Sequence, residues 1–174
     1  MQKTMDESEQ KRIFDEWLNQ HKGLFFKVVR AFAFNLHDQD DLFQEISIQI
    51  WHSIPNFRGD SSVSTWIYRV ALYAATAWSR QERKHHDNKQ PLAGIEHTLL
   101  QSRQMADGRL DWLYEQIAQL NEIDRSLILL LLEGFNYQEM AVILGISESN
   151  VGVKIHRIKK HLAQKSQEMI QNGV

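Results

Sequence analysis

Apolar residues recur at helical spacing along almost the whole chain, and no segment alternates apolar and polar residues as a half-buried strand does. The chain is therefore predicted to be all-α. The helical pattern falls into two blocks, separated by a polar stretch over residues 83–108 that lacks sustained periodicity. We expect two small helical domains, over residues 8–82 and 109–168, joined by a flexible linker.

In the first domain, the apolar spacing predicts four helices. Gly23 is expected to separate the first helix from the second. Asp38 or Asp40 can cap the third helix and Ser64 the fourth, because short polar side chains accept hydrogen bonds from the free amides of a helix start. A break at Pro55 separates these two helices.

The segment from Tyr137 to His156 has the pattern of a short helix, a glycine turn and a second helix, which is the layout of a DNA-reading helix-turn-helix. Gly145 can adopt the positive φ of a tight turn, and Ser147 can cap a second helix that starts near Glu148. The stripe expected to be buried on that helix is Val151, Ile155, Ile158 and Leu162. With two helices before it, we expect a four-helix, winged-helix-like domain without a wing.

The other faces of this second helix carry polar and basic side chains, namely Ser149, Asn150, Lys154, His156, Arg157, Lys159 and Lys160. Such a mixture suits base edges and phosphates of duplex DNA. A solvated face on an ordinary core helix is the alternative that this pattern leaves open.

The third predicted helix has two different sides. Phe43, Ile46 and Ile50 can face the core, whereas the opposite face carries Asp41, Gln44, Glu45, Ile48 and His52. Carboxylates beside an exposed isoleucine suit docking onto a basic and apolar protein surface. A merely solvated helix face remains the alternative.

The fourth predicted helix also has two stripes. The apolar one is Ile67, Val70, Ala71, Ala74, Ala77 and Trp78, and the other is Trp66, Arg69, Tyr73, Thr76 and Arg80. Aromatic rings stack on unpaired bases while arginines contact phosphates, and the small polar residues of the preceding loop, FRGDSSVST, can surround an extruded base. The pattern leaves open that Trp66 and Tyr73 belong to the core.

Composition limits the chemistry. The absence of cysteine excludes disulfides and thiolate metal sites, and the histidines do not place three ligands on one rigid surface. Without a phosphate-binding glycine loop or a recognisable catalytic motif, we expect no enzyme activity, no metal and no cofactor. The chain start lacks a secretory signal, and the longest aliphatic run, Leu127 to Leu132, is too short to span a membrane. We therefore expect a cytoplasmic protein with no membrane insertion.

The net charge of −2 hides an uneven distribution. Acidic residues outnumber basic ones over residues 1–50, whereas basic residues dominate over 58–89 and 145–165. This separation suggests that different parts of the chain meet different partners.

In this order, the segments resemble the extracytoplasmic-function group of bacterial sigma factors, over about residues 10–165. Residues 38–51 match the polymerase-docking helix of the family, residues 57–71 its promoter-melting segment and residues 137–156 its −35 reader. The resemblance implies a sigma factor that binds core RNA polymerase and promoter DNA and directs initiation through −10 and −35 elements. An anti-sigma factor is a further partner that is usual in this family.

The resemblance also implies roles for individual residues. Polymerase binding is assigned to Asp41, Leu42, Gln44, Glu45 and Ile48. Contact with the −10 element is assigned to Phe57, Arg58, Asp60, Ser61, Ser62, Ser64, Trp66, Arg69, Tyr73, Thr76 and Arg80. Contact with the −35 element is assigned to Ser149, Asn150, Lys154, His156, Arg157, Lys159 and Lys160.

The chain departs from the family pattern at a few positions. Leu72, Tyr73 and Ala77 stand where an Arg-Asn pair and an aspartate are common, which changes the expected −10 preference. Gly152 replaces a common lysine and removes a phosphate contact, and Asn121 replaces a common proline but can cap a helix equally well. Two other functions remain as alternatives: a stand-alone helix-turn-helix regulator of duplex operators, and a histidine metalloprotein or hydrolase.

Overall fold

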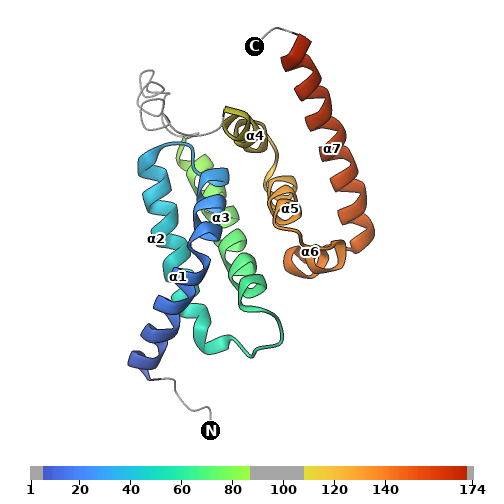
Figure 1. Ribbon diagram of the computed structural model, residues 1–174. Coiled ribbons are helices and arrows are strands. Elements are labelled where there is room, and N and C mark those ends of the chain that lie inside the picture. Colours follow the sequence, from blue (N-terminus) through green and yellow to red (C-terminus); the bar gives the residue numbers. More distant parts are fainter. Residues whose placement is uncertain (1–5, 87–107, 172–174) are drawn as a thin grey trace. The chain divides into compact units, whose positions relative to one another are not determined.

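The computed structural model describes residues 6–86 and 108–171, and every regular element within these ranges is helical (Figure 1). The chain divides into two compact units, one on each side of the boundary between Asp107 and Gly108. The predicted all-α class with two helical domains is confirmed. Of the predicted linker, residues 83–86 belong to the last helix of the first unit and Gly108 begins the next helix, whereas residues 87–107 lie outside the described residues.

Helix α1 (Glu7–Phe32) joins two segments that the sequence predicted as separate helices. Its backbone leaves the helical region at His21, where φ is −116° and ψ is 19°, so the break lies there and not at Gly23. Gly23 is exposed with open space around it, and its missing side chain weakens the helix without ending it. The buried residues of α1 are Trp17, Leu24, Phe25, Val28, Val29, Ala31 and Phe32.

Helix α2 (Leu36–Ser53) is followed by η1, a single 3-10 turn (Ile54–Asn56). Asn35 caps α2, because its Oδ1 accepts a 2.8 Å hydrogen bond from the amide of Asp38. The prediction of Asp38 or Asp40 as the cap is therefore wrong. Asp38 lies in the first turn, where its carboxylate accepts a 2.6 Å hydrogen bond from Asn35 Nδ2 and interacts favourably with the helix dipole.

Helix α3 (Val63–His86) starts one residue after its cap, Ser62. The Ser62 hydroxyl accepts a 3.1 Å hydrogen bond from the amide of Thr65, so the prediction of Ser64 as the cap is wrong. The cap is also the last residue of the exposed loop that follows η1.

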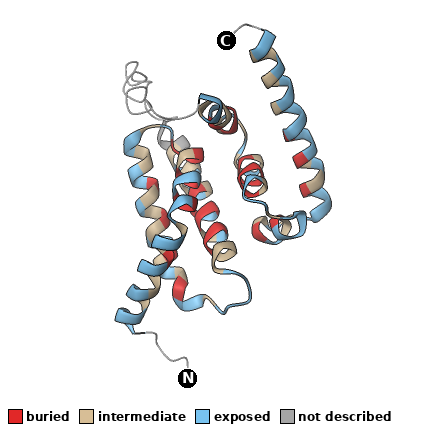
Figure 2. Ribbon diagram, viewed as in Figure 1, coloured by how far each residue is buried: buried red, intermediate tan, exposed pale blue. Residues whose placement is uncertain are grey.

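The core of the first unit forms where α1, α2 and α3 pack against one another (Figure 2). On α2 the buried residues are Leu42, Ile46 and Ile50, whereas Phe43 is half-buried against the rings of Phe25 and Phe26. On α3 they are Ile67, Tyr68, Ala71, Leu72, Ala74 and Ala75. The predicted stripes are thus displaced around each helix axis, and Ala77, predicted to be apolar core, is exposed.

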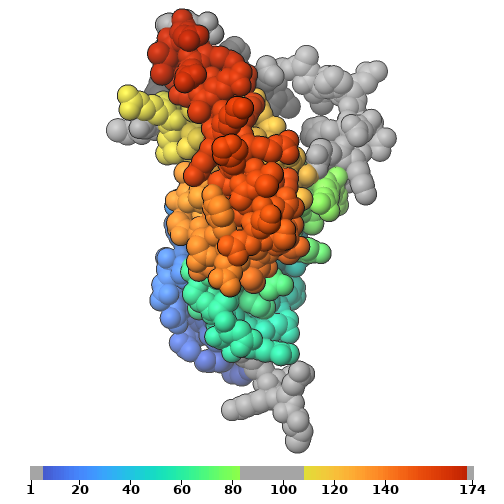
Figure 3. Space-filling view, turned by 90° about the vertical axis from the view of Figure 1, so that its right-hand side faces the viewer, coloured from blue at the N-terminus to red at the C-terminus, as the bar shows by residue number. Residues whose placement is uncertain are grey.

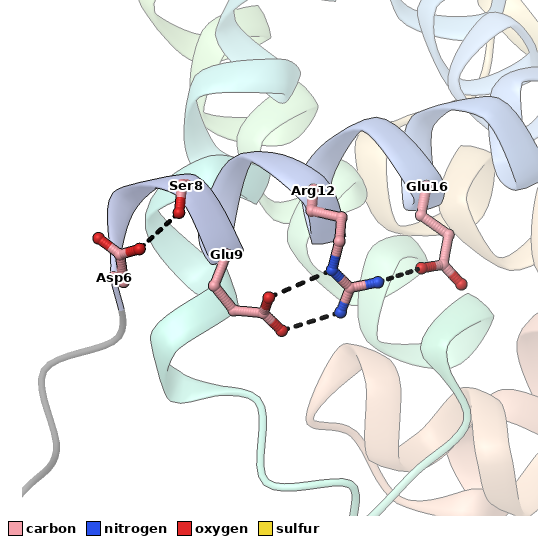
Figure 4. A network of polar contacts seen from close by, with 5 residues as sticks. All are labelled: Asp6, Ser8, Glu9, Arg12 and Glu16. Carbon is pink, nitrogen blue, oxygen red and sulfur yellow. Dashed lines mark hydrogen bonds and ion pairs between the residues drawn. The ribbon is translucent and has the colours of Figure 1, made fainter.

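The first turns of α1 carry ion pairs on their surface (Figure 4). The Arg12 guanidinium donates to both carboxylate oxygens of Glu9, at 2.8 and 3.2 Å, and lies 3.5 Å from Glu16. Hydrogen bonding to Arg12 lowers the pKa of Glu9. Because these groups are exposed, water and salt screen them, and they add little to the free energy of folding.

Packing, rather than charge, holds this part of α1 in place. The ring of Phe14 meets Trp51 of α2 edge to face, with centroids 5.7 Å apart. Gln10 Nε2 donates a 2.8 Å hydrogen bond to the carbonyl oxygen of Trp51. These contacts attach the first half of α1 to the end of α2.

The second unit consists of α4 (Gly108–Ala118), α5 (Glu122–Leu132), α6 (Tyr137–Leu144) and α7 (Glu148–Gln171). Asn121 caps α5 as predicted, with Oδ1 accepting a 3.0 Å hydrogen bond from the amide of Asp124. The aliphatic run of α5 is buried from Leu127 to Leu130, but Leu132 is exposed. Within the described residues, no helix combines the length and apolar character that a membrane span requires.

Arg125 is a buried charge that the sequence pattern did not single out. Its Nη2 donates hydrogen bonds to the carbonyl oxygens of Ala118, at 2.7 Å, and Leu120, at 2.8 Å. Both carbonyls lie at the end of α4, where unsatisfied acceptors and the helix dipole favour a cation. The side chain therefore fixes the turn between α4 and α5.

The predicted helix-turn-helix is confirmed in α6 and α7. Gly145 has φ 67° and ψ 33°, and the Ser147 hydroxyl accepts a 3.2 Å hydrogen bond from the amide of Asn150. Helix α7 begins at Glu148 and packs on α5 and α6. In its predicted stripe Val151, Ile155 and Ile158 are buried and Leu162 is half-buried.

The half-buried His21 gives folding a pH dependence. Burial lowers the pKa of His21 below its ordinary value of 6.5, because desolvation penalises the imidazolium. The unfolded chain then binds this proton more readily, so the stabilising contribution is full above pH 6.5 and is lost as the pH falls through the folded pKa. We expect His21→Gln to reduce the loss of unfolding free energy between roughly pH 7.5 and pH 5.5, measured by urea unfolding. An equal loss in both proteins would contradict this assignment.

Two glycines of the helix-turn-helix should respond in opposite ways to the same substitution. A Cβ added at Gly152 would lie 3.7 Å from the Tyr137 ring, an ordinary contact. Gly152→Ala should therefore stabilise α7 by about 1 kcal/mol through helix propensity. Gly145→Ala should destabilise the unit by about 1 kcal/mol, because alanine is strained at positive φ. Native-state hydrogen exchange of α7 amides measures both effects, and a change of the same sign in both variants would contradict the roles given to the two glycines.

Candidate functional site

The acidic face predicted on the third helix is present on α2. Asp41, Gln44, Ile48 and His52 are exposed and Glu45 is half-buried, on the side of α2 opposite its buried stripe. Leu42 is fully buried. It therefore belongs to the core, and its predicted direct contact with a partner protein is corrected to a structural role.

The carboxylates of this face are only weakly engaged within the chain. Asp41 lies 3.5 Å from His37 Nε2, and Glu45 accepts a 2.8 Å hydrogen bond from Gln49 Nε2. His37 and Gln49 are both exposed and lie on the same helix. The two carboxylates therefore stay available to a cationic surface. Ile48, 49% exposed, adds apolar area that a protein partner can bury.

Two aromatic residues assigned to the −10 element, Phe57 and Trp66, pack against other residues of the unit. The Phe57 ring lies 5.2 Å from Trp17 of α1 and 5.6 Å from Trp66 of α3, measured between centroids. Trp66 Nε1 donates a 3.0 Å hydrogen bond to Ser53 Oγ. Phe57 and Trp66 are both half-buried, so their first role is packing.

The loop between Phe57 and α3 exposes every residue from Arg58 to Ser62. The Ser62 hydroxyl is hydrogen-bonded to the Ser64 hydroxyl at 3.0 Å and to the Thr65 hydroxyl at 2.8 Å, and it accepts a 3.1 Å hydrogen bond from the amide of Thr65. Ser62 and Ser64 are therefore committed to the helix start. Arg58, Asp60 and Ser61 are the other predicted loop residues that are exposed, and Ser61 Oγ donates a 3.3 Å hydrogen bond to the carbonyl oxygen of Ser62.

The outward stripe of α3 exposes one ring and two guanidinium groups, whereas Trp66 is half-buried. Arg69, Tyr73 and Arg80 are exposed and Thr76 is half-buried. Tyr73 is 81% exposed, which excludes the alternative that it belongs to the core. An aromatic face one helical turn from an arginine can stack on an unpaired base while the arginine contacts a phosphate.

On α7 the outward surface is open along the helix (Figure 3). The predicted DNA-facing residues that are exposed are Ser149, Asn150, His156, Arg157, Lys159 and Lys160. Val153 is 57% exposed and lies between Ser149 and Arg157 on the same face. The pattern missed Val153 because it is apolar, although its spacing from the buried stripe places it outward.

Lys154 differs from the other basic residues of α7. Its Nζ lies 2.9 Å from Asp124 Oδ1 of α5, and only about a fifth of each side chain is exposed. Asp124 also accepts a 2.8 Å hydrogen bond from Asn121 Nδ2 through its other oxygen. The charge of Lys154 is therefore already balanced within the unit, and its contact with DNA stays a prediction.

Two known sequence profiles match the segments that carry the α2 face, the outward stripe of α3 and the helix-turn-helix. The profile of Sigma-70 region 2 matches residues 17–85, and that of Sigma-70 region 4 matches residues 110–162. The chain belongs to the extracytoplasmic-function group of the sigma-70 family. Sigma factors of this family are not enzymes; they bind core RNA polymerase and direct it to promoter DNA, and this sigma factor does the same.

Curated relatives and solved structures agree with this assignment. The sigma factor is 26% identical to the RNA polymerase sigma factor YlaC of Bacillus subtilis, over 77% of this chain and 83% of YlaC. It is 24% identical to the ECF RNA polymerase sigma-E factor of Escherichia coli, over 76% of each chain.

The fold is shared with two proteins solved as complexes, CnrH and the sigma factor RpoE. CnrH, in complex with the cytosolic domain of CnrY, superposes with a TM-score of 0.64 at 20% identity, over 91% of this chain and 90% of that chain. RpoE from Bartonella quintana, in complex with the anti-sigma factor NepR, superposes with a TM-score of 0.67 at 17% identity, over 94% and 99%.

The family assignment decides between the alternative functions. A stand-alone regulator left the first unit without a task, whereas the region 2 match accounts for it. The family assignment also excludes the hydrolase alternative, because the family is non-enzymatic. Among the described residues, no group of three or more histidines and carboxylates could hold a metal ion.

Proposed function

We propose that the solvent face of α2 is the polymerase-binding surface of this sigma factor. Asp41, Gln44, Glu45 and Ile48 would form the contact, and Leu42 would hold the face in place from the core. The observation that carries the proposal is the position of two carboxylates and an exposed isoleucine on one side of a helix whose other side is buried. Charge would favour the encounter with a basic surface, and burial of Ile48 would add affinity.

The proposed −10 surface consists of the exposed loop and the outward stripe of α3. Its members are Arg58, Asp60, Ser61, Arg69, Tyr73, Thr76 and Arg80. Tyr73 supports this assignment best, because an exposed ring beside an arginine suits an unpaired base better than intact duplex. Of the departures from the family pattern, Leu72 is buried, so only Tyr73 and Ala77 alter this surface.

The proposed −35 surface is the outward face of α7. Its members are Ser149, Asn150, Val153, His156, Arg157, Lys159 and Lys160. Polar residues near the start of the helix suit base edges in the major groove, and the later basic residues suit phosphates. Lys154 would orient this face through Asp124 rather than contact DNA.

We also propose that the protein works in the cytoplasm, where its polymerase partner is, and that an anti-sigma factor controls it. The second point is supported by the structure of RpoE in complex with the anti-sigma factor NepR. Two exposed apolar residues at the start of α2, Phe34 just before it and Leu36 at its first position, would add area for such a protein partner.

Charge reversal on α2 tests the docking surface. Asp41→Lys combined with Glu45→Lys should abolish association with core polymerase, because two attractive contacts become repulsive. The fold should remain, since both carboxylates make only exposed interactions within their own helix. Co-purification with core polymerase is the measurement.

The matched control for this charge reversal is Asp15→Lys combined with Glu16→Lys on α1. It changes the net charge equally and also removes only exposed pairs, with Lys11 and Arg12. Association should be retained in this control. Loss of association in both variants would show a general charge effect, and retention in both would refute the docking surface.

Two basic residues of α7 should differ in the salt dependence of DNA binding. Arg157→Ala should reduce the slope of log affinity against log salt by about 0.9, because one phosphate contact disappears. Lys154→Ala should change the slope much less, since Asp124 already neutralises Lys154. Fluorescence anisotropy with a labelled promoter duplex measures both slopes. Equal slope changes in the two variants would contradict the assignment of Lys154.

A further inference from the structure

The exposed loop from Arg58 to Ser62 is fixed at both ends by different means. At its end, Ser62 is tied to the first turn of α3 by three hydrogen bonds. At its beginning, the backbone amide of Phe57 donates a 3.1 Å hydrogen bond to the carbonyl of Ile54, and the Phe57 ring enters the unit. Every loop residue between these anchors is exposed.

The ring of Phe57 is held between two tryptophans. Trp17 of α1 meets it edge to face, at 5.2 Å and an interplanar angle of 89°. Trp66 of α3 meets it at 5.6 Å and 57°. We call Trp17, Phe57 and Trp66 the aromatic clamp. Trp17 is only 6% exposed, so it has no surface with which to contact DNA.

One side of the clamp is locked by hydrogen bonds. Trp66 Nε1 donates to Ser53 Oγ at 3.0 Å, and the same hydroxyl donates to the carbonyl of Ile50 at 2.8 Å. The indole of Trp66 is thereby fixed to the last turn of α2. Trp17 completes the clamp from a third helix, so all three helices of the first unit meet at the beginning of the loop.

We propose that Trp17 is a positioning residue for recognition of the melted strand, acting through Phe57 on the loop that holds an extruded base. This inference rests on the proposed −10 surface. A loop of small polar residues loses conformational entropy when it becomes ordered around a ligand. Because the Phe57 ring already restricts the start of this loop, less entropy is lost on binding. Removing Trp17 should therefore weaken base selection while leaving polymerase docking on α2 intact.

The chain contains a matched control for Trp17. Phe14 lies on the same helix and makes the same kind of edge-to-face contact, at 5.7 Å, but with Trp51 of α2. Its ring does not take part in the clamp. Phe14→Leu and Trp17→Leu each remove one edge-to-face contact of α1, although Trp17 is the larger and more buried side chain, and only the second should affect the loop.

The experiment uses holoenzyme assembled from core polymerase and the full-length chain. A non-template-strand oligonucleotide, selected from a randomised library by wild-type holoenzyme, serves as the probe, together with copies that each carry one abasic site. For the wild type, one abasic position should weaken binding about tenfold, as expected for a single held base. For Trp17→Leu this ratio should fall below about threefold, whereas Trp17→Phe and Phe14→Leu should keep it near the wild-type value.

The outcomes separate the inference from the function on which it rests. If Trp17→Leu keeps the tenfold ratio, or if Phe14→Leu loses it equally, Trp17 is not a positioning residue. If the wild type shows no abasic effect at any position, the proposed −10 surface itself is wrong. If Trp17→Leu does not assemble with core polymerase, Ser53→Ala serves as the test, because it releases Trp66 with almost no change of side-chain volume. An abasic-site ratio retained in Ser53→Ala overturns the role of the clamp, and a reduced ratio supports it.

Discussion

The burial of one apolar stripe on each helix determines which side chains are left for partners. On α2, the stripe of Leu42, Ile46 and Ile50 is fully buried. Because successive helical residues are turned by about 100°, this stripe alone directs Asp41 and Ile48 to the solvent. The stripe of α7 acts in the same way on its basic residues. The proposed polymerase and DNA surfaces are therefore consequences of core packing, and a displaced stripe would displace them too.

Features that depend on neighbouring residues could be predicted from the sequence, and features that depend on distant residues could not. The turn at Gly145 and the cap at Ser147 follow from local rules, and both are present. Helical spacing also placed Ile46 and Ile50 in the core, but spacing alone does not show the centre of a stripe, so Phe43 was preferred to Leu42. The partner of Lys154 lies 30 residues away in the sequence, and no periodicity reveals it. The same limit hid the contact of Trp17 with Phe57, a residue that the resemblance had assigned to the −10 element.

Both units are larger than the segments that the family profiles cover. The region 2 match begins at residue 17, yet Phe14 and Gln10 already attach α1 to Trp51. The region 4 match ends at residue 162, yet α7 continues to Gln171. Small domains bury a modest fraction of their surface, so an added aromatic contact is a substantial part of what holds them folded. The extra turns of α1 therefore contribute to a region whose sequence is otherwise shared with the family.

The carboxylate of Asp124 joins two structures that are usually considered separately. One of its oxygens accepts from Asn121, the cap of α5, and the other pairs with Lys154 of α7. If α5 began one residue earlier or later, Asp124 would turn by about 100° and lose Lys154. The length of the turn before α5 is therefore constrained as strictly as its composition, since an insertion there would disturb the DNA-facing helix without altering a single residue of it.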